Sequence, residues 1–404
     1  MSEDAFIFDA VRTPRGKGKP GGGALYEVKP IDLVVTLLNA LRERNALDPA
    51  RVEDLIMGIS SAVGDQGSCL PRIAALCAEQ GWAQVPGMAL QRFCGAGLEA
   101  VNLAAAKIRS GWQDLIAAGG LESMSRIGLG AAGGAWIYDP ATSLKIAYVP
   151  QGYSADMMAA LGGFDRAQLD AYALRSQQLA AAAQRAGHFS ASLVPVRDAN
   201  GLTVLDHDEY IREETTLQSL AALKPAFGGP SAAANHAVAR QRYPQLEHIA
   251  AAHTAGSSSG IVDGAALLLI GSAKAGKTLR LRPRARIVGI GLVPVDSTLM
   301  LAGPGPATRQ ALEKAGLSLS QIDLFEVNEA FAAVPLYFAK ELGVPLDKLN
   351  VNGGAIAMGH PIGATGAIIL GTLLDELERR KLRYGVATLC TAGGMGVATV
   401  IERL

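Results

Sequence analysis

The chain carries the same run of strand-like and helix-like segments twice, and this duplication constrains its fold more than any other feature. In the first half the order is strand, helix and strand, over residues 54–60, 97–111 and 114–120. The second half repeats it, over residues 322–331, 363–380 and 386–394. Asp54 precedes Gly97 by the same number of residues as Asp323 precedes Gly366. Since strand, helix and strand in this order form a parallel unit, the sequence predicts two similar α/β halves packed in layers.

Residues 128–253 do not share the strand and helix pattern of the two repeated halves. They contain one strongly helical segment, 170–187, whereas residues 228–253 begin with a Gly, Pro and Ala run that is typical of a loop. We interpret this stretch as an inserted subdomain, where a lid or a clamp for a ligand would lie. The predicted division is an N-terminal half over 1–127 completed by about 254–279, an insertion over 128–253, and a C-terminal half over 280–404.

The charge balance argues against nucleic-acid and membrane binding. The sequence holds 37 basic and 37 acidic residues, so the protein has no overall field that would attract a polyanion. An anionic ligand would need a local site. The first residues are acidic where a signal peptide is basic, and no apolar run approaches the length of a membrane span. We therefore expect a cytoplasmic protein without membrane insertion.

The cysteines indicate working thiols rather than a disulfide or zinc framework. Cys69, Cys77, Cys94 and Cys390 show no C-x-x-C spacing, and this pattern is typical of a reducing compartment. Cys69 and Cys77 fall in a predicted helix whose apolar positions would be core or subunit contacts. We assign no metal site.

One motif favours a nucleotide-binding interpretation. Residues 271–278 read GSAKAGKT, which matches G-x-x-x-x-G-K-[ST], the phosphate-binding loop of NTPases. That loop works because a helix begins directly after it and directs its N-terminal amides at the phosphates. Here the following residues alternate and include Pro283, which predicts extended chain leading into a strand. We therefore interpret 271–278 as a short helix or turn at the surface.

Four residues lie where chemistry is expected, although each also has a structural explanation. Cys94 starts a predicted helix whose free amides would favour a thiolate, and the alternative is an inert buried cysteine. His360 is held between glycine and proline in a glycine-rich loop, but such a histidine also suits a solvent-facing position. Asn328 ends a predicted strand, where it would orient an oxygen or cap a helix. Cys390 ends another strand before a glycine turn, or is a core residue.

Taken together, these segments resemble the thiolase family of acyl-CoA C-acyltransferases over essentially the whole chain. Four motifs in this order carry the resemblance: QRFCGAGLEAV (91–101), NEAF (328–331), GGAIAMGHPIGATG (353–366) and VATLCTAGG (386–394). Four further segments agree: AVRTPRGK (10–17), GGLESMSR (119–126), LKPAF (223–227) and TAGSSSGIVDGAA (254–266). The resemblance implies two duplicated βαβαβαββ halves in a five-layered α-β-α-β-α thiolase fold. It also implies a loop domain over 128–253 that binds coenzyme A, and a homodimer or homotetramer.

The resemblance further implies roles in cleaving a 3-ketoacyl-CoA, or in the reverse condensation. Cys94 would attack and become acylated while His360 takes its proton, and Cys390 would protonate the leaving enolate and then activate coenzyme A. A water held by Asn328 would act with His360 as one oxyanion site. The backbone amides of Cys94 and Ala392 would form the other. The family usually has glycine at the position of Ala392, which leaves the geometry of this amide open.

Coenzyme A is implied as a co-substrate, with no permanently bound cofactor. Its predicted contacts are Arg212, Ser219, Ala255, Ser259, Ala330 and Phe331. The chain departs from acetoacetyl-CoA thiolases at Pro150 and Gln151, where those enzymes usually have His-Met, and by an insertion between residues 227 and 254. We therefore favour degradative cleavage of longer or bulkier 3-ketoacyl-CoAs over an acetoacetyl-CoA-specific acetyltransferase.

Two further classes of protein fit part of this pattern. A 3-ketoacyl synthase acting on carrier-bound chains shares the fold but pairs its cysteine with two histidines, or with histidine and asparagine, and Cys390 in a glycine turn argues against it. A non-catalytic acyl-CoA-binding relative would be expected to lack Cys94, His360 or Cys390, and all three are present.

Overall fold

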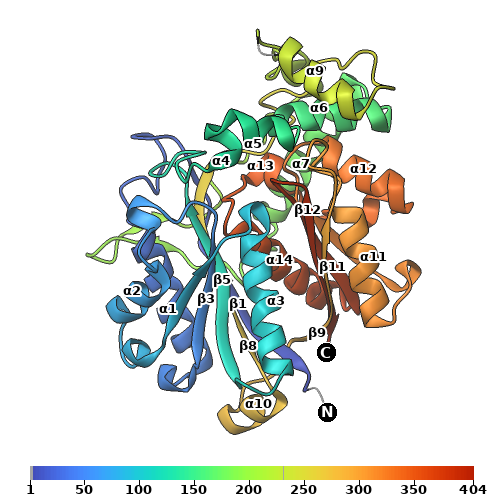
Figure 1. The fold of residues 1–404 in the computed structure, drawn as a ribbon. Helices are drawn as coiled ribbons and strands as arrows, with labels where there is room; N and C mark the ends of the chain where they lie inside the picture. The colour runs from blue at the N-terminus through green and yellow to red at the C-terminus, as the bar shows by residue number, and fades with distance from the viewer. Residues whose placement is uncertain (1–2, 231) are drawn as a thin grey trace.

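The computed structural model describes residues 3–230 and 232–404, and ten strands of this part of the chain form one large sheet (Figure 1). The strand order is β10-β11-β12-β9-β1-β8-β5-β3-β4, with β2 paired to β8. The strands before residue 280 are β1 (Ala5–Arg12), β2 (Gly16–Lys17), β3 (Asp54–Ile59), β4 (Gly87–Leu90), β5 (Leu115–Ser123) and β8 (Val262–Gly271). Those after it are β9 (Ala285–Pro294), β10 (Leu324–Val327), β11 (Tyr384–Thr391) and β12 (Met395–Arg403).

The two halves repeat one order of elements, as the duplication predicts. β3 pairs in parallel with β4 and β5, β10 pairs in parallel with β11, and β8 and β12 run antiparallel to their neighbours. The counterpart of β4 in the second half is reduced to a single bridge between Phe325 and Leu349. A short antiparallel pairing of residues 5–7 with 285–287 joins the two half-sheets. They are therefore continuous at this edge rather than separate sheets.

Helices and half-sheets form five layers, which confirms the predicted α-β-α-β-α fold class (Figure 1). The six helices of these layers are α1 (Pro30–Asn45), α2 (Leu70–Cys77), α3 (Ala96–Arg109), α11 (Pro304–Ala315), α12 (Ala333–Leu342) and α14 (Thr365–Arg380). α1 and α2 cover the outer face of the first half-sheet, and α11 and α12 that of the second. α3 and α14 lie between them, in one buried cluster with Ile56, Leu268, Leu389 and Val397.

Glycine lets the two central helices meet at their N-terminal ends. A Cβ on Gly97 would lie 2.5 Å from the carbonyl oxygen of Gly363, and one on Gly366 would lie 2.4 Å from the backbone nitrogen of Leu98. These distances leave no room for a side chain, so both positions need glycine for the backbones to approach. Gly97 and Gly366 are the pair that marks the repeat in the sequence, and one packing requirement accounts for both.

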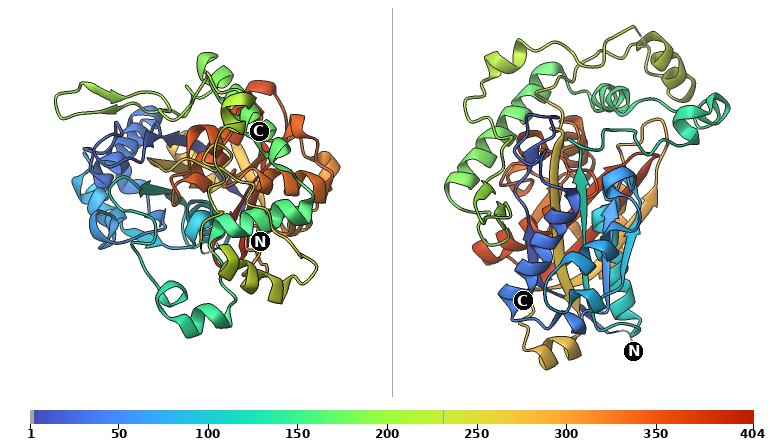
Figure 2. Two further views of the ribbon diagram at one scale, coloured as in Figure 1. Left: turned by 90° about the horizontal axis from the view of Figure 1, so that it is seen from above. Right: turned by 90° about the vertical axis from the view of Figure 1, so that its left-hand side faces the viewer.

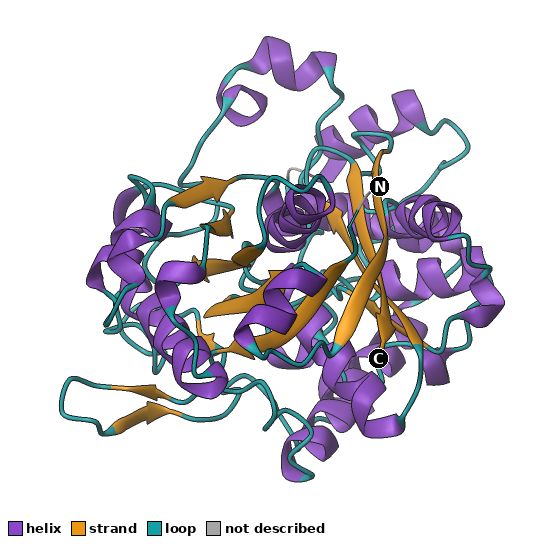
Figure 3. Cartoon of the chain, turned by 90° about the horizontal axis from the view of Figure 1, so that it is seen from below, coloured by secondary structure: helices purple, strands orange, loops and turns teal. Residues whose placement is uncertain are grey.

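Residues 128–253 cover one end and one side of the layered body (Figures 1 and 2). Their elements are α4 (Ala135–Tyr138), α5 (Pro140–Lys145), α6 (Gln151–Gly162), α7 (Arg166–Arg185), β6 (Val196–Arg197), β7 (Thr203–Leu205), α8 (Leu217–Ala221) and α9 (Ala232–Arg242). α7 begins before the predicted helix over 170–187, because Asp165 and Gln168 form a capping box at its N-terminus. The β6-β7 hairpin projects from the body (Figure 3).

The segment that the sequence marks as rich in loops, 228–253, contains the helix α9. The ring of His236 on this helix packs edge-on against Tyr153 of α6, with ring centroids 6.0 Å apart. Tyr243 donates a hydrogen bond to Asp296 at 3.0 Å, and Ile249 is buried. The insertion is therefore anchored to the body by apolar and polar contacts.

The nucleotide-loop motif lies within a helix, α10 (Ala273–Leu279), so Gly276 and Lys277 are helical. Ser272 caps this helix by accepting a hydrogen bond from the amide of Ala275 at 3.1 Å. The chain then enters β9 without a further helix. Residues 271–294, all of them described, thus lack the loop followed by a helix that binds phosphate.

Short elements complete the fold. They are α13 (Ala355–Met358) and the 3-10 helices η1 (Pro49–Arg51), η2 (Gly64–Gln66), η3 (Trp82–Gln84), η4 (Phe93–Gly95), η5 (Leu319–Gln321) and η6 (Leu346–Lys348). No helix in the described ranges has the length and apolar character needed to cross a membrane.

Candidate active site

The predicted catalytic segments gather at the end of the central layer that residues 128–253 cover (Figure 1). Cys94 lies directly before α3 and His360 lies in the loop before α14, so both stand at the N-terminal ends of the paired central helices. Asn328 follows β10 and Cys390 lies near the end of β11, its parallel neighbour. Carboxyl ends of parallel strands and the N-termini of helices share one edge of such a fold, which places the four residues there.

A strained turn presents Cys94. The residue lies in η4, which leads directly into α3, and its side chain is buried. Phe93 has a φ of +46°, a left-handed value that is unfavourable for a bulky residue. A Cβ on Gly95 would lie 2.8 Å from side-chain atoms of Thr391 and Val397. The turn can therefore pack against the second half of the fold only with glycine there, and this contact fixes the position of the thiol.

Three N–H donors lie within hydrogen-bonding reach of the Cys94 thiol. They are its own backbone amide, the backbone amide of Ala392 and the side-chain amide of Gln151. Burial raises the pKa of the thiol to about 11, and the three donors offset this only in part, while the charge of Glu122 raises it further. The free thiol is therefore protonated at neutral pH. An anion formed at this position would be stabilised by the same donors.

The turn after β11 delivers the amide of Ala392 to the thiol without requiring glycine at that residue. Gly393 and Gly394 both have φ +76°, and they are the left-handed residues of the turn. Ala392 keeps a negative φ, which any L-residue adopts. Alanine in place of glycine thus leaves the direction of this amide unchanged.

His360 is held as a neutral imidazole with one defined tautomer. The hydroxyl of Thr365 donates to the carbonyl oxygen of Pro361 at 2.9 Å, so the same hydroxyl must accept the hydrogen bond that joins it to Nδ1 of His360 at 2.6 Å. Nδ1 therefore carries the hydrogen, and Nε2 keeps its lone pair. Burial, followed by the positive charge of Arg15, lowers the pKa of His360 to about 3. The imidazole is thus ready to accept a proton at Nε2.

Asn328 directs its side-chain amide at His360. Its Nδ2 lies 3.4 Å from Nε2 of the imidazole, which suits donation to the nitrogen lone pair. Its Oδ1 is buried and has no hydrogen-bond partner in the described part of the chain. A buried amide oxygen without a partner is costly, so this atom is placed to accept a hydrogen bond from a ligand or a water.

Cys390 faces the same region from β11. Burial raises the pKa of its thiol, and the charge that Cys94 can carry raises it further. The Cys390 thiol therefore lies within electrostatic reach of Cys94. A neutral thiol in an apolar setting is suited to give its proton to an anion formed beside it.

Glu122, at the end of β5, fastens the loop that carries His360 to the first half of the fold. Its buried carboxylate accepts hydrogen bonds from the backbone amides of Ser60 and Gly363 at 2.9 Å each. Gln66 donates to the other carboxylate oxygen at 2.7 Å. The catalytic loop of the second half is therefore positioned by residues of the first.

Three predicted coenzyme A residues, Arg212, Ser219 and Ala255, line one surface pocket of about 230 Å³. The exposed guanidinium of Arg212 lies 5.1 Å from the ring centroid of Tyr210. Ser219 forms the capping box of α8 with Thr216, so its hydroxyl already bonds the backbone of that helix. Among these three residues, the charge available to a phosphate comes from Arg212.

The other three predicted coenzyme A residues form a wall that leads from this pocket to the catalytic loop. The amide of Ser259 donates to the carbonyl oxygen of Ala330 at 3.0 Å, and Phe331 is bridged to the same strip of chain. One residue further on, the carbonyl oxygen of Gly260 accepts the amide of His360 at 2.8 Å. The backbone thus connects the predicted pantetheine contacts directly with the predicted base.

The sequence motifs do not assign a role to three residues that support the catalytic side chains. Gln151 contacts Cys94, Thr365 sets the tautomer of His360, and Glu122 holds the loop at Gly363. Gln151 stands out in the sequence only as a departure from a family pattern. The spacing of Thr365, one helical turn after Pro361, was a usable signal. Glu122 offered no such signal, because nothing in the neighbouring sequence indicates that its carboxylate reaches the C-terminal half of the fold.

His253 is a structural residue of the insertion. Its ring is buried, with Nδ1 2.8 Å from a carboxylate oxygen of Asp156 and Nε2 accepting the amide of Ala333 at 3.3 Å. Nε2 accepts a hydrogen bond, so Nδ1 is the donor to Asp156. No cluster of three or more His, Cys, Asp or Glu side chains able to hold a metal ion occurs within the described ranges.

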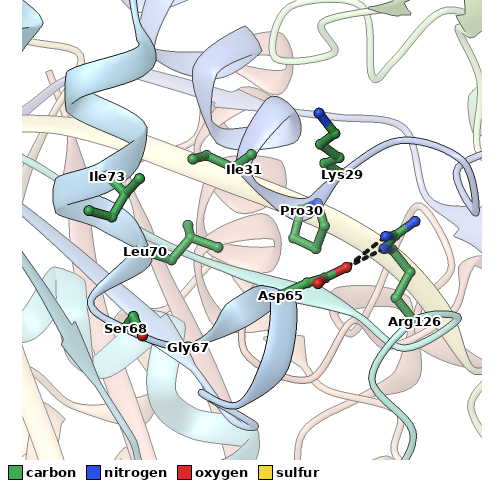
Figure 4. Close-up of a pocket in the computed structure, with 9 residues that line it drawn as sticks. All are labelled: Lys29, Pro30, Ile31, Asp65, Gly67, Ser68, Leu70, Ile73 and Arg126. Carbon is green, nitrogen blue, oxygen red and sulfur yellow. Dashed lines mark hydrogen bonds and ion pairs between the residues drawn. The ribbon is translucent and has the colours of Figure 1, made fainter.

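A larger pocket, of about 360 Å³, lies between α1 and α2, away from these residues (Figure 4). It is lined by Lys29, Pro30, Ile31, Asp65, Gly67, Ser68, Leu70, Ile73 and Arg126. Arg126 and Asp65 pair with each other at 2.7 Å across it. This pairing neutralises Arg126 and Asp65, and none of the predicted site residues contributes to the lining.

Comparison with known proteins identifies the family. The family model described as "Thiolase, N-terminal domain" matches residues 5–238, and "Thiolase, C-terminal domain" matches residues 281–403. The chain belongs to the thiolase family. Proteins named 3-ketoacyl-CoA thiolase from Serratia proteamaculans and Erwinia tasmaniensis are 40% and 41% identical to it, over 100% of both sequences. The crystal structure of the Bacillus anthracis acetyl-CoA acetyltransferase matches with a TM-score of 0.85 and 35% identity, covering 100% of this chain and 99% of that one.

Membership of the thiolase family makes the chain an acyltransferase and confirms the resemblance drawn from the four motifs. The nucleotide-loop match at 271–278 has no part in this identification. The roles of individual residues in this thiolase stay predictions, which the geometry described above supports.

Proposed function

We propose that this thiolase uses coenzyme A to cleave a 3-ketoacyl-CoA into acetyl-CoA and a shortened acyl-CoA, in a degradative pathway such as β-oxidation. The environment of Cys94 supports this most strongly: a buried thiol before a helix, with two backbone amides at hand and a second thiol beside it. Cleavage of a carbon–carbon bond next to a thioester needs a nucleophile, donors for an oxyanion and an acid for the departing enolate. The site offers all three. Coenzyme A is a co-substrate here, and the proposal includes no permanently bound cofactor.

In the first half-reaction Cys94 gives its proton to Nε2 of His360 and attacks the keto carbon of the substrate. Both groups start neutral, because burial disfavours the thiolate and the imidazolium separately, and the proton moves as the sulfur–carbon bond forms. The tetrahedral intermediate then breaks its carbon–carbon bond. The acetyl-CoA enolate that leaves takes the proton of Cys390, and Cys94 remains acylated.

In the second half-reaction the thiolate of Cys390 takes the proton of an incoming coenzyme A thiol. The coenzyme A sulfur attacks the acyl group on Cys94, and the departing Cys94 sulfur recovers its proton from His360. The same steps in reverse give the condensation. The thiol of Cys390 thus acts as an acid in the first half-reaction and as a base in the second, and it recovers its proton within one cycle.

Two sites would stabilise the oxyanions of this reaction. The amides of Cys94 and Ala392, which act on the Cys94 sulfur, would donate to the tetrahedral oxygen on the acylated cysteine. His360 and a water bound to Asn328 would donate hydrogen bonds to the thioester oxygen of the enolate. The Oδ1 of Asn328, which has no hydrogen-bond partner among the described residues, supports this use because it can accept a hydrogen bond from that water. Removing one such donor typically costs about 3 kcal/mol of barrier.

Coenzyme A would lie along the pocket and wall described above, between a loop domain over residues 128–253 and the layered body. Arg212 and Ser219 would lie at the nucleotide end, and Ala255, Ser259, Ala330 and Phe331 along the pantetheine. The halves 1–127, completed by about 254–279, and 280–404 would carry the catalytic residues. We further propose a cytoplasmic homodimer or homotetramer.

The names of the relatives support a general 3-ketoacyl-CoA substrate, because those from Serratia proteamaculans and Erwinia tasmaniensis are called 3-ketoacyl-CoA thiolases. Gln151 adds a polar group beside Cys94, and the insertion with α9 packs against α6, which carries Gln151. An acetoacetyl-CoA-specific acetyltransferase is the second candidate, favoured by the match to the Bacillus anthracis acetyl-CoA acetyltransferase structure.

The function is tested by thiolysis. The purified protein is incubated with coenzyme A and 3-ketoacyl-CoAs of increasing chain length and branching, and products are followed by chromatography with mass detection. We expect acetyl-CoA and the shortened acyl-CoA in equal amounts, with longer chains preferred over acetoacetyl-CoA. Omission of coenzyme A is the control. Acetoacetyl-CoA as the only substrate turned over would support the second candidate, and no product from any substrate would contradict the proposal.

In the free enzyme, alkylation of Cys94 by iodoacetamide should depend strongly on pH. Because burial raises the pKa of the thiol to about 11, the reactive thiolate is a minor species at neutral pH. Its fraction, and with it the rate, should grow about tenfold per pH unit from about pH 6 to about pH 9. Mass spectrometry of the Cys94 peptide measures the rate, and the exposed Cys69 serves as an internal control. A plateau at neutral pH would instead reveal a preformed thiolate and imidazolium pair.

A further inference from the structure

Arg15 lies at a junction of three segments, next to the loop that carries His360. Its side chain is buried, although a guanidinium is always charged. Nη2 lies 3.0 Å from the sulfur of Met358, and Nη1 lies 3.4 Å from the carbonyl oxygen of Gly359. The two residues directly before His360 are therefore in contact with this guanidinium.

Asp208 holds Arg15 in this position. It follows the projecting β6-β7 hairpin, and its carboxylate accepts the backbone amide of Arg15 at 2.9 Å, Nε at 3.2 Å and Nη2 at 3.1 Å. Arg12 binds the same carboxylate through two nitrogens, at 2.8 and 2.9 Å, and its guanidinium lies over the ring of Phe189. Burial alone would raise the pKa of Asp208, but the two guanidiniums outweigh it and hold that pKa well below its usual range. One carboxylate thus faces two cations.

The other acidic groups around the His360 loop offset the positive charge of Arg15 only in part. Glu326 of β10 acts on Arg15, but burial and the charge of Glu329 raise the pKa of Glu326 well above the usual range, which disfavours its charged form. Glu329 is itself bonded to Tyr172, Ser176 and the amide of Ile356. Glu122 of β5 is engaged by amides at Gly363, beyond His360. Asp263 of β8, which follows the Val262 that packs on Gly359, is bonded to Ser125. The two thiols, Cys94 and Cys390, are neutral in the free enzyme.

We propose that Arg15 is a positioning residue for the base: it fixes the Met358–Gly359 turn and, through its charge, adds to the burial that keeps the His360 imidazole neutral until substrate arrives. Arg12, on the same carboxylate, lacks this effect because it points toward Phe189 and not toward the loop. This inference rests on the proposed role of His360 as the base. Its consequence is that the transferred proton is held loosely on Nε2, which favours its return to Cys94 when the acyl group leaves.

The test is the acid limb of the pH profile of kcat/KM for thiolysis, measured with the full-length protein. kcat/KM falls at low pH when the imidazole of His360 is protonated in the free enzyme. With Arg15→Gln the imidazolium becomes less costly, so we expect this limb to move up by roughly one pH unit, whereas a merely structural loss would lower the rate equally at every pH. Arg15→Lys retains the charge and should restore the limb of the unmodified protein. Arg15→Met is a second neutral variant, for use if Arg15→Gln does not fold.

Arg12→Gln is the matched control. It removes a guanidinium from the same carboxylate and should lower the thermal stability, while the acid limb stays where it is in the unmodified protein. An unmoved limb in both neutral Arg15 variants, or an equal shift in Arg12→Gln, would overturn the proposal. Thiolysis by the unmodified protein is measured in the same series, so a complete lack of turnover bears on the proposed function, whereas an unmoved limb bears on Arg15 alone.

Discussion

Replacement of Cys94 by alanine should abolish both turnover and the formation of an acyl-enzyme. The thiol is the group that would form the covalent bond, and the amides of Cys94 and Ala392 act on that sulfur. Loss of a nucleophile that acts within such a unit typically costs on the order of 10⁵-fold or more in kcat. Mass spectrometry of the intact protein after incubation with acetyl-CoA measures the acyl group, and peptide mapping places it.

Cys390→Ala is the variant that separates the two thiols. It should lose thiolysis, because the enolate then lacks its acid and coenzyme A its base, but the Cys94 peptide should still gain the acetyl mass from acetyl-CoA. A small buried alanine suits the site, since Cys390 lies in an apolar cluster. Acetylation found on Cys390 in the unmodified protein, or missing from its Cys94 peptide, would reverse or remove the assigned roles.

Replacement of His360 by alanine should lower kcat/KM by about 10³- to 10⁴-fold, the range expected for a general base that also donates to an oxyanion. The variant loses the lone pair on Nε2 that the Thr365 contact makes available and leaves Asn328 without its partner. We expect the Cys94 thiol to remain present but to become acylated slowly. Burial raises the pKa of this thiol, and the variant has no imidazole to accept its proton. Single-turnover acetylation, followed by mass spectrometry, measures this step.

Thr365→Val is the control for the tautomer. Valine has nearly the shape of threonine, yet it cannot accept the hydrogen on Nδ1, so the imidazole is free to place its hydrogen on Nε2. We expect kcat/KM to fall by less than in His360→Ala, with the binding of coenzyme A unaltered. If His360→Ala acylates at the rate of the unmodified protein, another group accepts the proton and the base has been misassigned.

The sequence predicts the architecture well because its signals are local. The repeated strand and helix periods identify two α/β halves, and the shared glycines Gly97 and Gly366 mark the positions where the backbones of α3 and α14 approach. The rejection of a phosphate loop at 271–278 also follows from local chemistry, since Pro283 precludes a continuing helix, and α10 followed by β9 confirms it. The sequence does not show that a three-residue pairing of β1 with β9 makes one continuous sheet, because strand pairing is a long-range contact.

The same distinction between local signals and long-range contacts applies to the candidate site. Its central residues, Cys94, Asn328, His360 and Cys390, could be named from motifs, because each stands at a strand end or a helix start. The insertion was harder to interpret, and 228–253, whose start the sequence predicts as a loop, also holds the helix α9, which the sequence did not predict. A run of small and polar residues has little periodicity, and the helix depends on packing against α6 that is invisible locally.

By itself the sequence determined the family, the duplicated α/β fold and the four side chains predicted to carry the chemistry, because periodicity, glycine and short motifs act over a few residues. Only the tertiary structure decided how those side chains are tuned. The neutral state and tautomer of His360 depend on Thr365 and Arg15, and the position of its loop depends on Glu122. Burial, hydrogen bonds and charge act through space, so these properties arise where distant segments of the chain meet.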